Sequence, residues 1–267
     1  MEKPEYYPRL DQAFGLLGMY LVFTFAVMIP LMIVFNLTGY ENVSLMNFTG
    51  YTVAGGLLLW WAIQRKRKWE GEGRIFSFGR IPPVLYPVLV LATLALSVVV
   101  EPLVDLIPAP DLIKELFAML GKADVFTFLV VAVSAPIIEE FLFRGIVLSG
   151  FLKIYSPWKA IILSSVFFGI FHLNPWQFIP AVFAGLLIGY VFWKTGSLLP
   201  CLFIHWINNF AGWLLGATSD TEAMSLKEIL HNDTMYDIII ACSVLVLAAS
   251  ILMLRRIPGG GPAGKND

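Results

Sequence analysis

Long apolar runs set the limits on how this chain can fold. A helix needs about 20 mostly apolar residues to cross the roughly 30 Å of hydrocarbon in a bilayer. The sequence contains eight such runs, near residues 13–36, 45–64, 84–104, 126–150, 158–174, 177–194, 198–216 and 235–254. These runs lack the polar/apolar alternation of a membrane β-barrel. We therefore predict an all-α polytopic membrane protein with about eight transmembrane helices.

The composition supports this class and excludes others. Hydrophobic residues make up 58% of the chain and charged residues 14%, whereas soluble domains carry about half apolar and a quarter charged residues. The net charge of -1 argues against a nucleic-acid partner. Cys201 and Cys242 both lie in apolar runs and give no disulfide framework. The lipid bilayer is therefore the expected partner of most of the surface.

The placement of lysine and arginine predicts the orientation. The loop QRKRKWEGEGR after the second run is the strongest basic cluster, which favours a cytoplasmic position. With eight spans, both termini are then also cytoplasmic, in the plasma membrane if the host is prokaryotic. The acidic loop SDTEAMSLKEILHND before the last run is predicted to be external, and PDLIKELFAMLGKAD to form an amphipathic helix on the membrane surface. Residues 1–267 form one membrane domain, with a flexible tail at about 257–267.

A small set of ionisable residues interrupts the apolar runs. A charge at the bilayer centre costs from about 2.5 to well over 10 kcal/mol, so such residues usually serve a function and face protein or water. With a rise of about 1.5 Å per residue, they lie at comparable depth in three different helices. We therefore predict that they line one polar intramembrane chamber. The set comprises Glu139, Glu140, Arg144, His172 and His205, with Asn208 and Asn209 beside the last.

The residue types in this set suit hydrolysis. A glutamate and a histidine can hold and deprotonate a water molecule. An asparagine amide and a second imidazole are suitable donors for the oxyanion that forms when water attacks a carbonyl. Glu139, His172 and His205 are also a plausible zinc set with one position left for water. The predicted cofactor is accordingly either none or a divalent metal such as zinc.

Simpler interpretations exist for several of these residues. Glu140 and Arg144 are four residues apart and could form a purely structural ion pair. A lone transmembrane histidine often makes only an interhelical hydrogen bond. Cys201 and His205 are also four apart, so a Cys–His nucleophile pair is geometrically possible, but it would leave Glu139 and His172 unexplained.

The ordered motifs resemble those of one known family. Glu139-Glu140-x-x-x-Arg144, Phe168-x-x-x-His172 and His205-x-x-x-Asn209 follow one another on separate apolar runs. In this order they resemble the motifs of the CPBP (Abi) family, which groups CAAX prenyl endopeptidases with bacteriocin-processing and immunity proteins. The run KTGSLLPCLFIHWINNF resembles the last motif region of that family. The resemblance covers about residues 126–215, which would form the catalytic core.

The resemblance implies an intramembrane endopeptidase that hydrolyses a peptide bond of a membrane-associated or CAAX-like substrate. Glu139 and His172 would activate the attacking water, and His205 and Asn209 would stabilise the oxyanion. Glu140 and Arg144 would shape and charge the site.

Two other classes of function remain as alternatives. The first is a catalytically silent membrane scaffold or bacteriocin self-immunity factor. The second is a small transporter with Glu139 and Glu140 as proton or cation sites, although a transporter would be expected to show inverted repeats.

Overall fold

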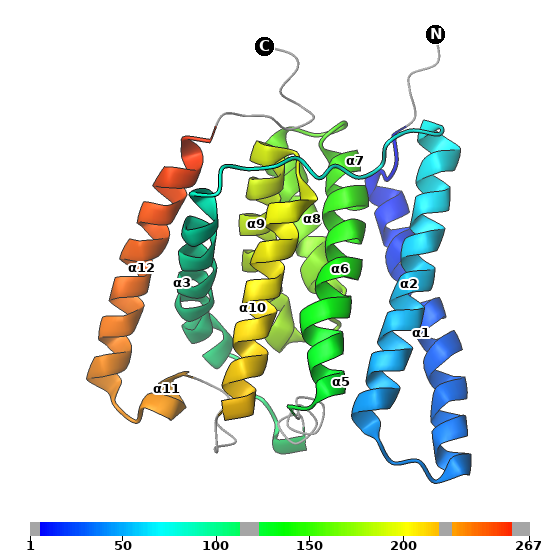
Figure 1. Ribbon diagram of the computed structural model, residues 1–267, viewed down its shortest axis with the longest axis horizontal. Helices are drawn as coiled ribbons and strands as arrows, with labels where there is room; N and C mark the ends of the chain where they lie inside the picture. The colour runs from blue at the N-terminus through cyan, green and yellow to red at the C-terminus, as the bar shows by residue number, and fades with distance from the viewer. Residues whose placement is uncertain (1–5, 113–122, 219–225, 258–267) are drawn as a thin grey trace.

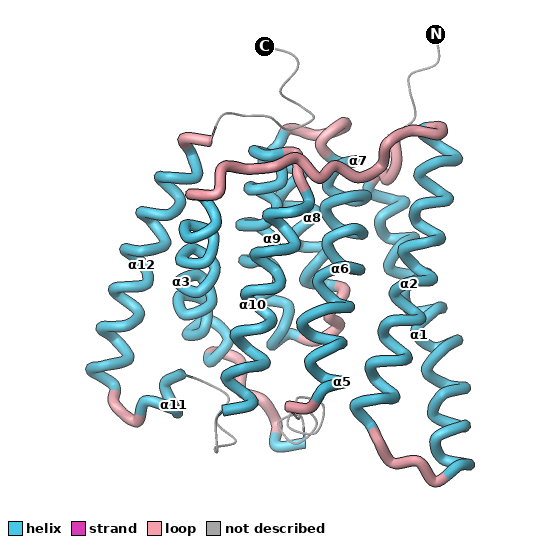
Figure 2. The backbone as a smooth tube through the Cα atoms, viewed as in Figure 1, coloured by secondary structure: helices cyan, strands magenta, loops and turns pink. Residues whose placement is uncertain are grey.

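The computed structural model describes residues 6–112, 123–218 and 226–257, and within them every regular element is a helix. Most of the predicted surface helix at 110–124, and all of the predicted tail at 257–267 except residue 257, lie outside the described residues. The all-α class predicted from the apolar runs is confirmed. Figure 2 shows helices that run up and down one bundle, joined by loops at its two ends, with a long loop between α2 and α3 crossing one of them.

The helices follow the predicted runs closely. In chain order they are α1 (Leu10–Thr38), α2 (Val43–Glu70), α3 (Leu85–Asp105), a continuous rod over Val125–Phe151, α8 (Pro157–Ile170), α9 (Pro175–Thr195), α10 (Leu198–Thr218), the short α11 (Leu226–Leu230) and α12 (Asp233–Arg255). The start of α1 and the end of α12 lie at the same end of the bundle (Figure 1). The described part of the chain therefore begins and ends on one side of the bundle, as expected for an even number of crossings.

Not every run is a full span. Among the described residues, six helices are long and apolar enough to cross a membrane: α1, α3, the Val125–Phe151 rod, α9, α10 and α12. The 28-residue α2 is long enough, but residues such as Asn47, Tyr51 and Thr52 make it less apolar. With 14 residues, α8 extends only about 21 Å. The prediction of about eight spans is thus approximate.

The predicted run 158–174 is too long at its end. α8 stops at Ile170, and His172 lies in the turn before α9 rather than on a helix. The cause is local, because Pro175 occupies the first turn of α9 and disfavours a helical conformation in the residue before it. The side chain of Asn174 then accepts a hydrogen bond from the Gln177 amide at 2.8 Å and caps α9.

The rod is not the regular helix that the run 126–150 predicted. It consists of α5 (Val125–Phe128), the π-helical segment η1 (Leu129–Ser134), α6 (Ala135–Glu140), the π-helical segment η2 (Phe141–Leu148) and α7 (Ser149–Phe151). At the end of η1 the Ala135 amide donates to the Val130 carbonyl, five residues back. Pro136 follows, and its missing N–H prevents a regular hydrogen-bond ladder here. π-helical segments are frequent at functional sites, and these two flank Glu139 and Glu140.

A buried lysine fastens the hairpin of α1 and α2 to the rod at one end of the bundle. Lys66 is 4% exposed, and its Nζ donates to the Tyr7 carbonyl at 3.0 Å, to Glu70 at 3.2 Å and to the Ser149 hydroxyl at 3.3 Å. Lys153 adds an ion pair of 2.7 Å to Glu70. The segment before α1, the end of α2 and the end of the rod are thereby held together.

The membrane topology, meaning the side of the membrane on which each loop lies, can be tested by cysteine labelling. We start from Cys242→Ser, because Cys242 is exposed and Cys201 is buried. Arg67→Cys and Arg256→Cys should react with a membrane-impermeant maleimide from the same side, predicted to be the cytoplasm, and Glu41→Cys from the other. Intact cells and inverted vesicles provide the two accessible faces. Labelling of all three positions from one side would contradict the bundle topology.

Candidate active site

Glu140, Arg144 and His205 form a buried charge network between the rod and α10. Arg144 donates from a terminal guanidinium nitrogen to Glu140 Oε1 at 2.8 Å, and His205 Nδ1 lies 2.7 Å from the same oxygen. The side chain of Glu140 is 0% exposed, and those of Arg144 and His205 are 2% and 6% exposed. The predicted Glu140–Arg144 ion pair is therefore present. Because a carboxylate oxygen accepts, Nδ1 of His205 carries a hydrogen.

Arg144 is satisfied from two further helices. Its second terminal nitrogen donates to the carbonyl of Gly185 on α9 at 3.4 Å. Its guanidinium carbon lies 4.8 Å from the ring centroid of Phe168 on α8, within the range of a cation–π contact. The charge network therefore connects the rod, α8, α9 and α10.

Glu139 is the accessible carboxylate of the pair. Its side chain is 18% exposed, whereas that of Glu140 is fully buried. The Tyr51 hydroxyl of α2 donates to Glu139 Oε1 at 2.6 Å. The other oxygen, Oε2, lies 3.7 Å from His205 Nε2. Glu139 is thus held from two sides at the edge of the buried network, where a small reactant can reach it.

His172 reaches the same region from the turn after α8. Its Nδ1 lies 3.0 Å from the carbonyl oxygen of Phe168, and since a carbonyl only accepts, Nδ1 must carry the hydrogen. Nε2 is then the nitrogen with a free lone pair. The Phe168 ring stands edge-on to both histidines, with centroid distances of 5.1 Å to His172 and 5.8 Å to His205. His172 is therefore linked to the network through Phe168.

Asn209 faces the rod about one helical turn along α10 from His205. Its Nδ2 donates to the carbonyl of Val131 in η1 at 2.8 Å, and its Oδ1 accepts from Asn208 Nδ2 at 3.1 Å. The Asn208 Oδ1 lies 3.0 Å from the Ser97 hydroxyl of α3. The structure thus places His205 beside both glutamates and Asn209 beside η1.

The possible zinc ligands do not form a three-donor set. Glu139 and His205 are neighbours, but the His172 ring is bonded to the Phe168 carbonyl and packs against the Phe168 ring. No group of three His, Cys, Asp or Glu side chains with metal-binding geometry occurs within residues 6–112, 123–218 and 226–257. The described residues as arranged do not fit a zinc ion.

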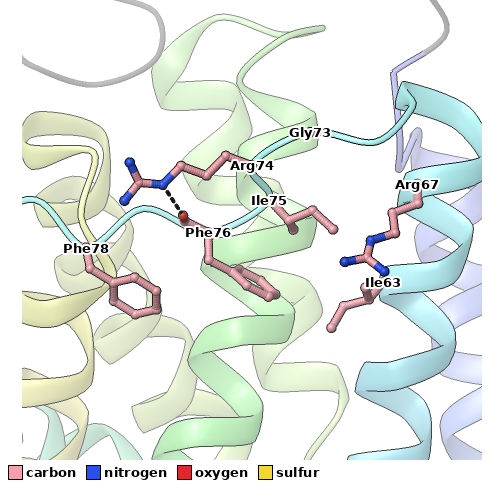
Figure 3. A pocket seen from close by; sticks show the side chains of 7 residues that line it. All are labelled: Ile63, Arg67, Gly73, Arg74, Ile75, Phe76 and Phe78. Atoms are coloured by element: carbon pink, nitrogen blue, oxygen red, sulfur yellow. Dashed lines mark hydrogen bonds between the residues drawn. The ribbon is translucent and has the colours of Figure 1, made fainter.

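A separate pocket opens beside the loop between α2 and α3. It has a volume of about 350 Å³. Figure 3 shows Ile63 and Arg67 extending from α2 toward Ile75 and the ring of Phe76, with Arg74 and Phe78 on the same loop. None of the predicted site residues lines this pocket. Phe76 connects this pocket to the site. The centroid of its ring lies 4.6 Å from that of Phe141, the residue after Glu140.

Sequence reasoning missed two contributors to the site. Tyr51 was treated as part of an ordinary span, and Ser97 as part of an apolar one. Their signal in the sequence is weak, because a single hydroxyl in a span is common and often bonds to its own helix backbone. The polar residues that make α2 less apolar than its neighbours were the one available clue for Tyr51.

The geometry defines a polytopic helical membrane protein with a Glu–His site buried between its helices. Residues 121–211 match the family model described as type II CAAX prenyl endopeptidase Rce1-like. This segment carries all the predicted site residues, and its match agrees with the resemblance to the CPBP group. The match supports CAAX-type intramembrane protease activity in general terms. No curated protein and no solved structure matches the chain.

The Glu140–Arg144 pair gives a stability prediction. Arg144→Ala leaves a buried carboxylate without its partner, which typically costs about 3–5 kcal/mol. We expect a lower folded yield in detergent and a clearly lower unfolding temperature than for the unchanged protein. The matched control is Arg9→Ala, which breaks the exposed pair of Arg9 and Asp11 and should cost at most about 1 kcal/mol. Equal unfolding temperatures for both variants would contradict the assigned network.

Proposed function

We propose that the chain is an intramembrane endopeptidase that uses Glu139 and His172 to activate water against a peptide bond. The substrate is a membrane-associated or CAAX-like peptide that approaches from the cytoplasmic side or laterally from the lipid. The observation that carries the proposal is the Glu139 carboxylate, partly exposed at the edge of a buried charge network and held by Tyr51. The family match of residues 121–211 supports the same chemistry.

The proposed first step is general-base hydrolysis. Glu139 accepts a proton from water as the water oxygen bonds to the substrate carbonyl carbon, and the carbonyl π electrons move to its oxygen. The Nε2 lone pair of His172 accepts a hydrogen bond from the same water and orients it. When the C–N bond breaks, the proton held by Glu139 moves to the leaving amine. No other reactant is needed to balance the reaction.

The proposed oxyanion donors are His205 and Asn209. Because Nδ1 of His205 already donates to Glu140, donation from Nε2 requires a doubly protonated ring. The two carboxylates lie against the two ring nitrogens, Glu140 at 2.7 Å from Nδ1 and Glu139 at 3.7 Å from Nε2. Asn209 adds an amide N–H, since only one of its two amide hydrogens is needed for Val131.

The main test is substitution of the base. Glu139→Gln preserves size and hydrogen bonding but removes the base, so turnover should fall by the ~10²–10⁴ typical of general-base catalysis. His172→Ala should lose turnover to a similar extent. The assay uses a fluorogenic farnesylated CAAX peptide with purified protein in nanodiscs, and membrane peptides from cells with unchanged or Glu139→Gln protein are compared by mass spectrometry. Folded yield of Glu139→Gln should be unchanged.

A defined result would support the alternative function. If Glu139→Gln and His172→Ala both retain full biological function, the protease proposal is wrong and a binding role as a scaffold or immunity factor replaces it.

Tyr51 offers a finer test of how Glu139 is held. Tyr51→Phe retains the ring but removes the hydroxyl that donates to Glu139 Oε1. A hydrogen bond to a charged group contributes about 1.5–3 kcal/mol, so we expect turnover to fall roughly 10- to 150-fold. In a Glu139→Gln background the same change should have a much smaller effect, because coupled residues are not additive. Equal fold-losses in both backgrounds would mean that Tyr51 acts independently of Glu139.

Metal dependence separates the two routes to an activated water. The proposed route uses side chains alone, so we expect turnover to be unchanged after treatment with a zinc chelator. Elemental analysis of the purified protein is the companion measurement. Stoichiometric zinc that is lost in both His172→Ala and His205→Ala would replace the proposed route with a metal-assisted one.

A further inference from the structure

The backbone of η1 leaves one carbonyl in need of a donor. The Val131 carbonyl would accept from the amide of residue 135 in an α-helix and from the amide of residue 136 in a π-helix. The Ala135 amide donates instead to Val130, and Pro136 has no N–H. Within a bilayer, an unsatisfied backbone carbonyl costs several kcal/mol, so a side chain must supply the hydrogen. The Nδ2 of Asn209, 2.8 Å away, does so.

This contact fixes which way the Asn209 amide points. Since the Val131 carbonyl can only accept, the Asn209 atom facing it must be Nδ2 rather than Oδ1. Oδ1 is therefore on the side of Asn208, and an oxygen there requires a donor. The Asn208 atom at 3.1 Å must then be its Nδ2. The orientation of the first amide thus determines that of the second.

The same logic extends to α3. With its Nδ2 directed at Asn209, Asn208 presents Oδ1 to Ser97, which lies 3.0 Å away. The Ser97 hydroxyl has one hydrogen and two acceptors at 3.0 Å, Asn208 Oδ1 and the Thr93 carbonyl. The Thr93 carbonyl already accepts a backbone amide within α3. Ser97 is the only described donor within reach of Asn208 Oδ1, so this hydrogen belongs on the Asn208 side. The hydrogen bonds then all run in one direction: Ser97 donates to Asn208, Asn208 to Asn209, and Asn209 to the Val131 carbonyl.

We infer that Ser97 and Asn208 are positioning residues that hold the Asn209 amide with its nitrogen toward the rod. In this orientation Asn209 retains a second N–H that makes no hydrogen bond to any described residue. The catalytic consequence, an oxyanion donor held in place before substrate arrives, rests on the proposed function. The orientation itself does not, because it follows from Pro136 and the acceptor-only carbonyl.

A purely structural role is the competing explanation. The same three side chains join α3 and α10 to the rod and could act only as interhelical hydrogen bonds. Such a role predicts a loss of stability when any member is removed, but no particular state of the Asn209 amide. The orientation of Asn209 is therefore the property to measure.

The experiment follows the Asn209 side-chain amide by NMR in protein labelled with ¹⁵N-asparagine in detergent micelles. Its two proton signals are assigned from their loss in Asn209→Ala. Loss of one neutral hydrogen bond should speed exchange of these protons about two- to tenfold in Asn208→Ala and more weakly in Ser97→Ala. Ser97→Thr retains the hydroxyl and should restore the exchange rate. The matched control is Ser250→Ala, because Ser250 is a buried serine of α12 that takes no part in these hydrogen bonds. It should leave the signals unchanged.

Two outcomes overturn the inference. One is an Asn209 amide whose shifts and exchange are the same in Asn208→Ala as in the unchanged protein. The other is equal exchange in Ser97→Ala, Ser97→Thr and Ser250→Ala. Since this measurement needs no substrate, an inactive protein would refute the proposed function while leaving the orientation testable.

With cleavage of the farnesylated peptide established, kinetics supply the functional test. We expect Asn208→Ala to lower kcat about two- to tenfold with KM unchanged, and to have no further effect in an Asn209→Ala background. A fall in kcat that is as large with Asn209 removed would show that Asn208 does not act through Asn209.

Discussion

One carboxylate oxygen, Oε1 of Glu140, is the point on which the arrangement of the bundle depends. It accepts from Arg144 and lies within hydrogen-bond distance of His205, while its residue is fully buried. Charges buried this deeply are tolerated only when paired and hydrogen-bonded. The rod, α9 and α10 must therefore approach closely enough to supply those partners. At Gly185 an added Cβ would lie 2.9 Å from the Ser165 side chain, so this glycine allows α8 and α9 to approach closely where its carbonyl meets Arg144.

Where the backbone within the bundle is irregular, side chains near the site donate hydrogen bonds to its free carbonyls. In the turn after α8 the His172 carbonyl is bonded by Asn174, and at the end of α8 the Phe168 carbonyl is bonded by the His172 ring. In η1 the Val131 carbonyl is bonded by Asn209. A bilayer tolerates such backbone only where protein groups replace the missing hydrogen bonds. The residues proposed for catalysis therefore also stabilise the broken helices that carry them.

The α1–α2 hairpin completes the site from the opposite side. α2 contributes Tyr51 to Glu139, and Thr52 bonds to Ser134 of the rod at 3.0 Å. These polar residues lower the hydropathy of α2, so a helix that is long enough to span the membrane but less apolar than its neighbours supplies the hydroxyl bonded to the accessible carboxylate. The Lys66 cluster fixes its far end to the rod. The position of Tyr51 thus depends on contacts about four helical turns away.

The sequence by itself determined the class of protein and the approximate spans, and it singled out the ionisable residues that the structure brings together. It could do so because lipid makes every buried charge costly, so Glu139, Glu140, Arg144 and His205 stood out against apolar flanks. The four-residue spacing also predicted the ion pair, since that contact lies within one helix.

Only the tertiary structure decided the rest. His172 lies in a turn because Pro175 and Asn174 start a new helix, and η1 forms because a helix containing Pro136 has competing hydrogen-bond patterns. Tyr51 and Ser97 matter only through partners 88 and 111 residues away. Such contacts arise from the packing of whole helices, and a local pattern in one helix contains no information about which residue of another will face it.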